Sequence, residues 1–385
     1  MRKLVIIFIT LYAVSLQAQT LSGDAEISVL TVGPGTSLND AFGHSAFRIK
    51  DNTNGLDVVY GYGEYDFDAP NFYLKFAQGK LQYLISKTDF KRFYRIYEYF
   101  NRSIDEQVLN LNISQKQKLY DFLLENYKPA NRRYLYDFFF DNCATKIKDV
   151  VNISTSNTVT YNTPSDYKAA TTFRTLIQNN LNRNSWGSLG IDIALGAVID
   201  QEATPEQHMF LPKNIYSFFE NATLNNVTPL VKQSRVIYKA KPKKVDSSFF
   251  SSPIFILGIL GLLIIFFTYK DYKNKKRTII LDVIIFTITG LAGVVILLLW
   301  LTTDHESTHN NYNLLWANPL NLIVLFQAFK KQPSHWFNKY LKFLVILLCL
   351  LTFHWITGVQ IFAVGLIPLI FALLVRYVFL AKRLA

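Results

Sequence analysis

Apolar and polar positions are unevenly distributed along this chain, and long apolar runs gather in its last third. From Phe249 onward they cover residues 253–269, 279–301, 314–329, 343–359 and 361–380. Most of these runs are long enough to cross ~30 Å of hydrocarbon as helices. The run 314–329 is the shortest and contains Asn318 and Pro319, so we expect its outer end to pack against protein rather than lipid. The pattern predicts an all-α transmembrane bundle of about five helices over 248–385.

The loops between these runs differ in charge, and this difference predicts the orientation of the bundle. Lysine and arginine gather in 270–277, 330–342 and the last five residues, whereas 302–313 and 357–361 contain none. The positive-inside rule places the basic loops and the C-terminus in the cytoplasm. An odd number of spans then leaves the N-terminal region on the opposite side of the membrane.

The first residues predict export. "MRKLVIIFITLYAVSLQAQT" has a basic start, a short apolar stretch and a small-residue exit near Ala18, which is typical of a secretory signal peptide over 1–18 with the mature chain starting near Gln19. An uncleaved N-terminal anchor is the alternative interpretation.

The region 19–247 is long enough to have its own core and predicts an α+β domain. Residues 25–33, 44–51 and 56–63 have strand composition, with "DNTNG" as the hairpin turn before the third strand. Residues 114–128 predict a helix with Ser114 as N-cap. "KAKPKKVDSS" (239–248) is the predicted linker into the membrane.

Charge and cysteine content narrow the classes of function. The chain has 40 Lys and Arg against 28 Asp and Glu. Much of this excess lies in the cytoplasmic loops, so we expect the bilayer and not nucleic acid as a partner. Cys143 is the only cysteine in the first 348 residues, and Cys349 lies within the fourth predicted span. An unpaired thiol in an oxidising compartment is either buried and inert or reactive and used.

The residues around Cys143 favour the reactive alternative. Asp141 or Asn142 can cap a helix that begins at Cys143, and backbone N–H groups with the helix dipole would favour the thiolate there. A thiol nucleophile also needs a base. His44, at the head of a predicted strand just after Gly43, is the better candidate, whereas His208 lacks a comparable setting. The alternative for His44 is a core histidine bonded to backbone.

The hairpin suggests a group that could orient His44. If "DNTNG" pairs Lys50 with Leu56, then His44 lies opposite Tyr62, with Glu64 beyond. Tyr62 and Glu64 are therefore the candidate orienting residues of a nucleophile, base and orienter arrangement.

Several strings resemble a known family. The "GHSAFRI" strand followed by the "DNCATKI" helix is similar to circularly permuted papain-like (NlpC-like) thiol domains, in which histidine precedes cysteine. More broadly the chain resembles the Bacteroidota membrane family that includes the lipoprotein N-acyltransferase Lnb. The shared strings are "FGHSAFRI", "VYGYGEYDFDAPNFYLKFAQGKLQY", "RYLYDFFFDNCATKI", "GIDIALGAVID", "MFLP" and "DHESTHNNYNLLWANPL". One departure is Gly61, where the family pattern leads us to expect a polar residue.

The resemblance implies an enzyme of the bacterial inner membrane with its catalytic domain in the periplasm. A phospholipid would donate an acyl chain to Cys143, with His44 as base and then acid. The acyl chain would pass to the α-amino group of a diacylglyceryl-cysteine lipoprotein, and no cofactor is expected. A thiol hydrolase of cell-wall peptides or lipids, and a non-catalytic scaffold, are the alternative classes.

Two further segments have candidate roles. The loop residues Asp304, His305, Glu306 and His309 form either a solvated polar loop or, less in keeping with the resemblance, a metal site. We expect this loop to dock on the thiol domain and form a lipid entrance that involves His305, Asn313 and Asn142.

His354, near the outer end of span four, is a functional or an interfacial residue. Part of 67–100 should be amphipathic and rest on the membrane, with Lys91, Arg92 and Arg95 toward phosphates.

Overall fold

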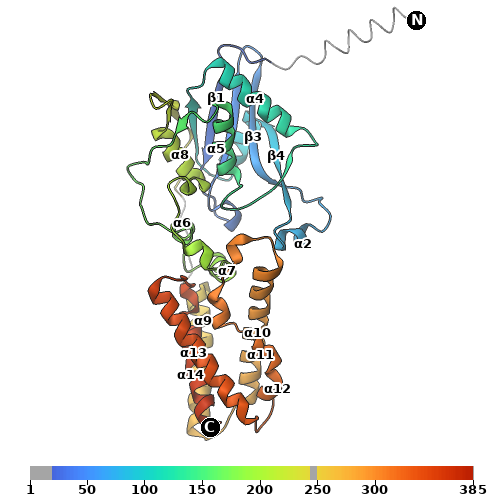
Figure 1. The fold of residues 1–385 in the computed structure, drawn as a ribbon, viewed down its shortest axis with the longest axis vertical. Helices are drawn as coiled ribbons and strands as arrows, with labels where there is room; N and C mark the ends of the chain where they lie inside the picture. The colour runs from blue at the N-terminus through green and yellow to red at the C-terminus, as the bar shows by residue number, and fades with distance from the viewer. Residues whose placement is uncertain (1–19, 243–248, 385) are drawn as a thin grey trace, which may run out of the picture. The chain divides into compact units, whose positions relative to one another are not determined.

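The computed structural model describes residues 20–242 and 249–384, so the predicted signal peptide and most of the predicted linker lie outside it. The described chain forms two compact units (Figure 1). The sheet unit comprises 20–72, 81–169 and 204–242, and the bundle unit comprises 73–80, 170–203 and 249–384. Two segments of the predicted N-terminal domain thus belong to the bundle unit. The predicted domain boundary at 247 and 248 stays a prediction.

The sheet unit is built on one antiparallel seven-stranded sheet of order β10-β5-β1-β2-β3-β4-β6. The strands are β1 Glu26–Val32, β2 His44–Asp51, β3 Leu56–Tyr65, β4 Gln82–Asp89, β5 Ile104–Leu109, β6 Arg133–Leu135 and β10 Val231–Tyr238. The three predicted strands are confirmed, and β3 runs two residues further than predicted. The strands β7 Val159–Thr160, β8 Thr223–Leu224 and β9 Thr228–Pro229 form a small second sheet.

Helices cover both faces of the main sheet because side chains alternate along each strand. On one face, α4 (Ile113–Tyr127), α5 (Cys143–Ser154) and α8 (Pro212–Asn221) share a core with Phe47 and Tyr60 (Figure 1). On the other face, Phe93 of α3 (Phe90–Tyr99) packs against Ala46 and Val59. Each large apolar side chain buried in these layers stabilises the unit by roughly 1.5–3 kcal/mol.

The predicted helix 114–128 is confirmed as α4, but its predicted cap is wrong. The N-cap is Asn112, whose side chain accepts a hydrogen bond from the backbone N–H of Gln115 (2.9 Å) while the Gln115 side chain accepts one from the N–H of Asn112 (3.0 Å). This reciprocal capping box satisfies two N–H groups at the start of α4.

The bundle unit contains four helices, among the described residues, that are long and apolar enough to cross a membrane. They are α9 Pro253–Lys273, α10 Ile279–Thr302, α13 His335–Thr357 and the stretch Val364–Arg383, which comprises η7 (Val364–Leu366) and α14 (Ile367–Arg383). The predicted span 314–329 is instead broken into η6 (Tyr312–Leu315), α11 (Leu320–Ile323) and α12 (Leu325–Ala328). Pro319 cannot continue a preceding helix, and the carbonyl of Ala317 lies where a Cβ on Gly293 of α10 would stand. The broken segment therefore packs on α10, as its Asn and Pro content predicted.

Hydrogen bonds between loops mark two ends of the bundle. At one end the Arg277 side chain donates to the carbonyl oxygens of Ala328 and Lys330 (both 3.0 Å). At the other end the backbone N–H of Tyr312 donates to the Gln360 side chain (2.7 Å). The broken segment thus runs from one end of the bundle to the other beside the four long helices, and five passes through the membrane stay a prediction. The basic loops predicted to be cytoplasmic share one end.

Buried ion pairs hold the helices together at that end. Arg376 of α14 contacts Asp271 of α9 and Asp282 of α10, both at 2.7 Å. Arg277 also contacts Asp282 (2.7 Å). Charges buried in an apolar bundle are costly unless they are paired, so this network fixes which helices meet.

The segments 73–80 and 170–203 pack on the opposite end of the bundle. The N–H of Gly196 donates to the carbonyl of Ser307 (2.9 Å), and the N–H of Asp304 donates to the carbonyl of Gln78 (2.9 Å). The loop 302–313 is therefore held by two segments of its own unit, and its docking on the thiol domain stays a prediction.

Candidate active site

Asn142 fixes the N-terminus of α5 directly before Cys143. Its side-chain oxygen accepts hydrogen bonds from the backbone N–H groups of Ala144 (2.7 Å) and Thr145 (3.0 Å). Of the two predicted caps, Asn142 is thus the one observed, whereas the Asp141 carboxylate pairs with a lysine of the same helix (2.6 Å). The helix begins at Cys143, as predicted.

The other end of the Asn142 side chain ties this cap to neighbouring backbone. Its amide nitrogen donates to the carbonyl oxygens of Phe138 (2.7 Å) and Phe210 (2.8 Å). The side chain is buried. Since its polar atoms have protein partners, Asn142 holds Cys143 in position, and its role at a lipid entrance stays a prediction.

The sulfur of Cys143 lies where α5 meets the start of β2. The backbone N–H groups of Ser45, Cys143 and Ala144 face the sulfur and each lowers the pKa of the thiol. Burial nevertheless raises the pKa of the thiol, and these donors and the charge of Arg102 only reduce that rise. The resting sulfur is therefore a neutral thiol and not the thiolate that its helix position alone would favour.

His44 is the first residue of β2, and glycines surround it. Gly43 has φ +85°, and a Cβ there would lie 2.6 Å from the carbonyl oxygen of Val32, so only glycine fits before His44. A Cβ on Gly61 would lie 3.1 Å from His44 Nε2. Burial, and secondly the charge of Arg102, lowers the pKa of His44 to about 4. The imidazole is thus uncharged at neutral pH, which is the form that accepts a proton.

Ser45 links the two candidate catalytic residues. Its N–H lowers the pKa of the Cys143 thiol, and Ser45 directly follows His44 in the chain. The strand and the helix predicted to carry the base and the nucleophile are thus adjacent at this point. Their catalytic roles stay predictions.

The predicted register between β2 and β3 is wrong by one residue. We expected Lys50 opposite Leu56, whereas Asp51 pairs with Leu56. The Asp51 carboxylate accepts a hydrogen bond from the Asn54 side chain within the turn (2.7 Å), which makes Asp51 the last paired residue of β2. A slip of one residue moves every side chain of the partner strand to the other face.

The two candidate orienting residues are affected differently by this register. Because Ala46 pairs with Gly61, Tyr62 points to the face opposite His44. Its hydroxyl donates to the Asn126 side chain on α4 (2.7 Å). Glu64 is exposed and lines the same cavity as His44. Orientation of His44 by either residue stays a prediction.

Sequence reasoning missed the role of Gly63, which forms a bulge in β3. The pairing of β3 with β4 shifts between Tyr62 and Glu64, and Gly63 has φ +92°. A Cβ at Gly63 would lie 3.9 Å from the Cβ of Cys143. A glycine inside a strand pattern signals a bulge or a close approach, so "GYGEY" contained this information.

A cavity of about 480 Å³ opens beside His44. Gly61, Glu64, Arg92, Tyr97 and Arg102 are among the residues that line it. Burial raises the pKa of Tyr97 to about 12; Arg102 opposes this rise and Cys143 adds to it.

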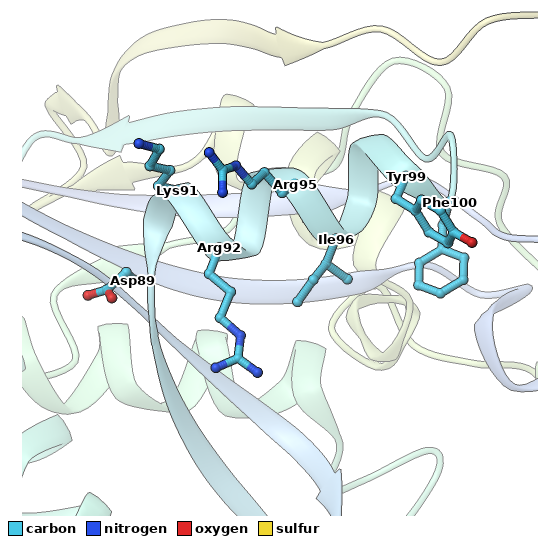
Figure 2. A pocket seen from close by; sticks show the side chains of 7 residues that line it. All are labelled: Asp89, Lys91, Arg92, Arg95, Ile96, Tyr99 and Phe100. Atoms are coloured by element: carbon cyan, nitrogen blue, oxygen red, sulfur yellow. The ribbon is translucent and has the colours of Figure 1, made fainter.

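A second, more open hollow of about 500 Å³ runs along α3. Figure 2 shows Lys91 and Arg95 projecting from one side of the helix and Arg92 and Ile96 from another, with two aromatic side chains at its C-terminal end. The predicted amphipathic element thus includes α3, with the three predicted basic residues on its exposed surface. Arg92 lines both cavities.

The other candidate residues have partners within their own units. His305 Nε2 lies 3.0 Å from the carbonyl oxygen of Phe76, next to α2 (Phe72–Ala77). Asn313 is buried and donates to the carbonyl of Asp192 (3.0 Å). The lipid entrance predicted for them stays a prediction. Residues 20–242 and 249–384 contain no group of three or more His, Cys, Asp or Glu suited to a metal ion.

The two remaining histidines singled out in the sequence pack against aromatic rings. His208 is buried in η3 (Gln207–Phe210), with its ring 4.9 Å from that of Tyr167. His354 lies 4.5 Å from the ring of Tyr312.

The fold and this site define a membrane protein in which an α+β domain with a thiol at a helix N-terminus is joined to an apolar helical bundle. Comparison with known families agrees: the Lnb N-terminal periplasmic domain matches residues 13–179, and the Lnb transmembrane domain matches residues 244–383. The chain belongs to the Lnb family and has a periplasmic and a membrane domain. No curated protein and no solved structure matches it.

Proposed function

We propose that the protein is a lipoprotein N-acyltransferase of the bacterial inner membrane. The observation that carries the proposal is the half-buried Cys143 thiol at the start of α5, which packs against β2, the strand that begins at His44. A nucleophile at a helix N-terminus beside an uncharged histidine suits covalent acyl transfer. Membership of the Lnb family suggests an enzyme and supports this class.

The first half of the reaction forms a thioester. His44 removes the thiol proton as the Cys143 sulfur attacks an ester carbonyl carbon of a phospholipid. The carbon–oxygen ester bond then breaks, His44 returns the proton to the departing oxygen, and a lysophospholipid leaves. The N–H groups around the sulfur stabilise the negative charge as it develops there.

The second half transfers the acyl chain to nitrogen. The free α-amino group of a diacylglyceryl-cysteine lipoprotein attacks the thioester carbonyl, its proton passes through His44 to the sulfur, and an amide forms. Each cycle converts one ester into one amide, without a redox step or a cofactor.

The membrane geometry supports lipid substrates. A chain that makes five passes would keep its periplasmic domain at the bilayer surface, where donor and acceptor both lie. The basic and aromatic surface of α3 fits an interfacial position, with charges toward phosphates and rings toward acyl chains. A soluble cell-wall substrate would need neither feature.

The decisive experiment traps the acyl-enzyme. Purified protein incubated with phospholipid alone should gain the mass of one acyl chain on the Cys143 peptide, labile to neutral hydroxylamine. A peptide with a free diacylglyceryl-cysteine amine should discharge it into a stable amide. Cys143→Ser and His44→Ala should form no amide while keeping the wild-type melting temperature within a few degrees.

The alternative classes give other products. A thiol hydrolase would release free fatty acid whether or not the amine is present. Normal transfer by Cys143→Ser would exclude the thioester route altogether.

A further inference from the structure

Arg102 carries a buried positive charge at the cavity that His44 also lines. The residue is only 7% exposed, yet it lines this cavity. It stands between α3 and β5, so its side chain reaches the face of the sheet to which α3 is attached. A buried arginine normally has all of its N–H groups paired, because an unpaired buried charge is costly.

The guanidinium is held along one edge. Its Nε donates to the carbonyl oxygen of Gly33 (2.9 Å), and its carbon lies 5.0 Å from the centre of the Tyr97 ring. These two contacts leave the terminal nitrogens free to meet a ligand.

The terminal nitrogens lack a strong protein acceptor. Nη2 is buried and has no hydrogen-bond partner among the described residues. Nη1 lies 3.8 Å from Asp40 Oδ2, which is longer than a hydrogen bond, while the other oxygen of that carboxylate, Oδ1, accepts a hydrogen bond from the N–H of Ser37 (2.9 Å). A buried donor left in this way requires an explanation, and a bound anion is one that also satisfies the charge.

The charges around the cavity favour an anion. Lys87, Arg92 and Arg102 line it with two carboxylates, Asp40 and Glu64, so the lining carries net positive charge while His44 is neutral. A planar guanidinium presents two parallel N–H groups to two oxygens of a phosphate.

We propose that Arg102 binds phosphate oxygens of the acyl-donor lipid in the cavity beside His44, with Arg92 as a second cation at the same cavity. This inference rests on the proposed function, since it names how the phospholipid would be recognised at that site. It makes the donor a phosphate-bearing lipid and excludes neutral glycerolipids.

The test measures binding without chemistry. Full-length Cys143→Ala protein in an uncharged detergent is titrated with a phosphatidylethanolamine that has two ether-linked chains, with the matching dialkylglycerol, and with inorganic phosphate. We expect binding of the ether phospholipid to weaken at least tenfold in Arg102→Gln, and binding of dialkylglycerol to be weak and unchanged. Arg92→Gln should weaken phospholipid binding less.

Control variants separate recognition from folding. The Arg235→Gln variant lacks a partly exposed arginine on β10, which is the edge strand opposite β6. It should bind the ether phospholipid as the Cys143→Ala protein does. If Arg102→Gln melts at a much lower temperature, phospholipid binding is measured in Arg102→Lys instead. The lysine keeps the charge but lacks the two parallel donors. Parent-like phospholipid binding by a folded Arg102 variant overturns the proposal. Equal occupancy by inorganic phosphate at the same concentration overturns the lipid as ligand.

The outcome is independent of the proposed reaction. Ether lipids cannot acylate Cys143, so their binding reports on the phosphate site and not on acyl transfer. If ether phospholipid binds through Arg102 but diacyl phospholipid leaves no adduct on wild-type Cys143, the acyl transfer fails and the phosphate site stands.

Discussion

Cys143 and His44 are both uncharged in the resting site, and this has a chemical consequence. Burial raises the pKa of the thiol and, with Arg102, lowers that of the imidazole to about 4. Moving a proton from sulfur to nitrogen is therefore uphill until substrate arrives. The free protein should be a weak nucleophile, protected from oxidation in the periplasm.

The first residue-scale prediction follows from these two pKa directions. In a Cys349→Ser background, alkylation of Cys143 by iodoacetamide should be slow at pH 7 and rise with pH to a midpoint above the usual value of 9.0. The sign follows because only the thiolate reacts and a raised pKa delays its formation. Mass spectrometry of the Cys143 peptide measures the rate. A fast, flat rate between pH 5 and 7 would indicate a thiolate–imidazolium pair instead.

A second residue-scale prediction concerns Gly61. In Gly61→Ala the new methyl would stand 3.1 Å from His44 Nε2 and 3.5 Å from the hydroxyl oxygen of Ser86. The ring must shift by a few tenths of an ångström, and we expect adduct formation on Cys143 to slow roughly tenfold. Stability should change by less than about 1 kcal/mol, because no positive φ is involved.

The control for Gly61→Ala is Gly23→Ala in the same unit, where a Cβ meets nothing within 4 Å. It should keep full activity. Full activity in Gly61→Ala as well would mean that the position of the imidazole does not matter to the reaction.

For single residues, the sequence predicted the features that neighbouring residues in the chain determine. The helix start at Cys143 and the strand start at His44 follow from a capping side chain and a glycine. The neutral state of the thiol could not be predicted, because burial depends on Ser45 and other residues that fold around it. Arg102 gave no local signal at all, since only the tertiary structure brings it beside His44.

At the scale of elements, the N-cap of α5 has more partners than an ordinary cap. Asn142 makes two bonds to the helix and two to other backbone segments, whereas Asn112 caps α4 at an exposed position. We expect Asn112→Ala to cost about 1 kcal/mol. Asn142→Ala should cost at least about 2 kcal/mol more, because two buried carbonyl groups lose their donor.

Thermal melting in detergent and hydrogen exchange would measure this difference. Exchange at the first-turn amides of α5 should speed up in Asn142→Ala while those of α4 stay protected. Equal losses in both variants would show that the buried bonds of Asn142 add nothing.

The sequence predicted correctly which of these segments form strands and helices, but it predicted the wrong pairing between β2 and β3. The strands of the first hairpin, α4 and the apolar helices follow from period and composition. The Asp51 side chain at the hairpin end accepts hydrogen bonds from Ser22 and Asn54, and composition does not show these contacts. The run 314–329 was predicted as the shortest span, but the sequence did not show that it divides into short helices that pack closely on Gly293.

For the whole molecule, the five passes predict an accessibility map. In a background without Cys143 and Cys349, Glu306→Cys should react with an impermeant maleimide in spheroplasts. Lys331→Cys should react only after permeabilisation, because the broken segment carries the chain to the basic end. Reaction of both from outside would make that segment a re-entrant loop, and the basic end would then not be cytoplasmic.

The assembly of the bundle unit also constrains how the protein is made. The ribosome completes 170–203 well before Asn311 and Gln360, whose side chains donate to the carbonyls of Ile193 (2.8 Å) and Leu195 (3.4 Å). Until those residues are inserted, this part of the chain waits in the periplasm with unpaired backbone groups, which makes it a target for chaperones and proteases. A chain terminated early, even beyond the catalytic residues, should therefore be degraded rather than released as a soluble enzyme.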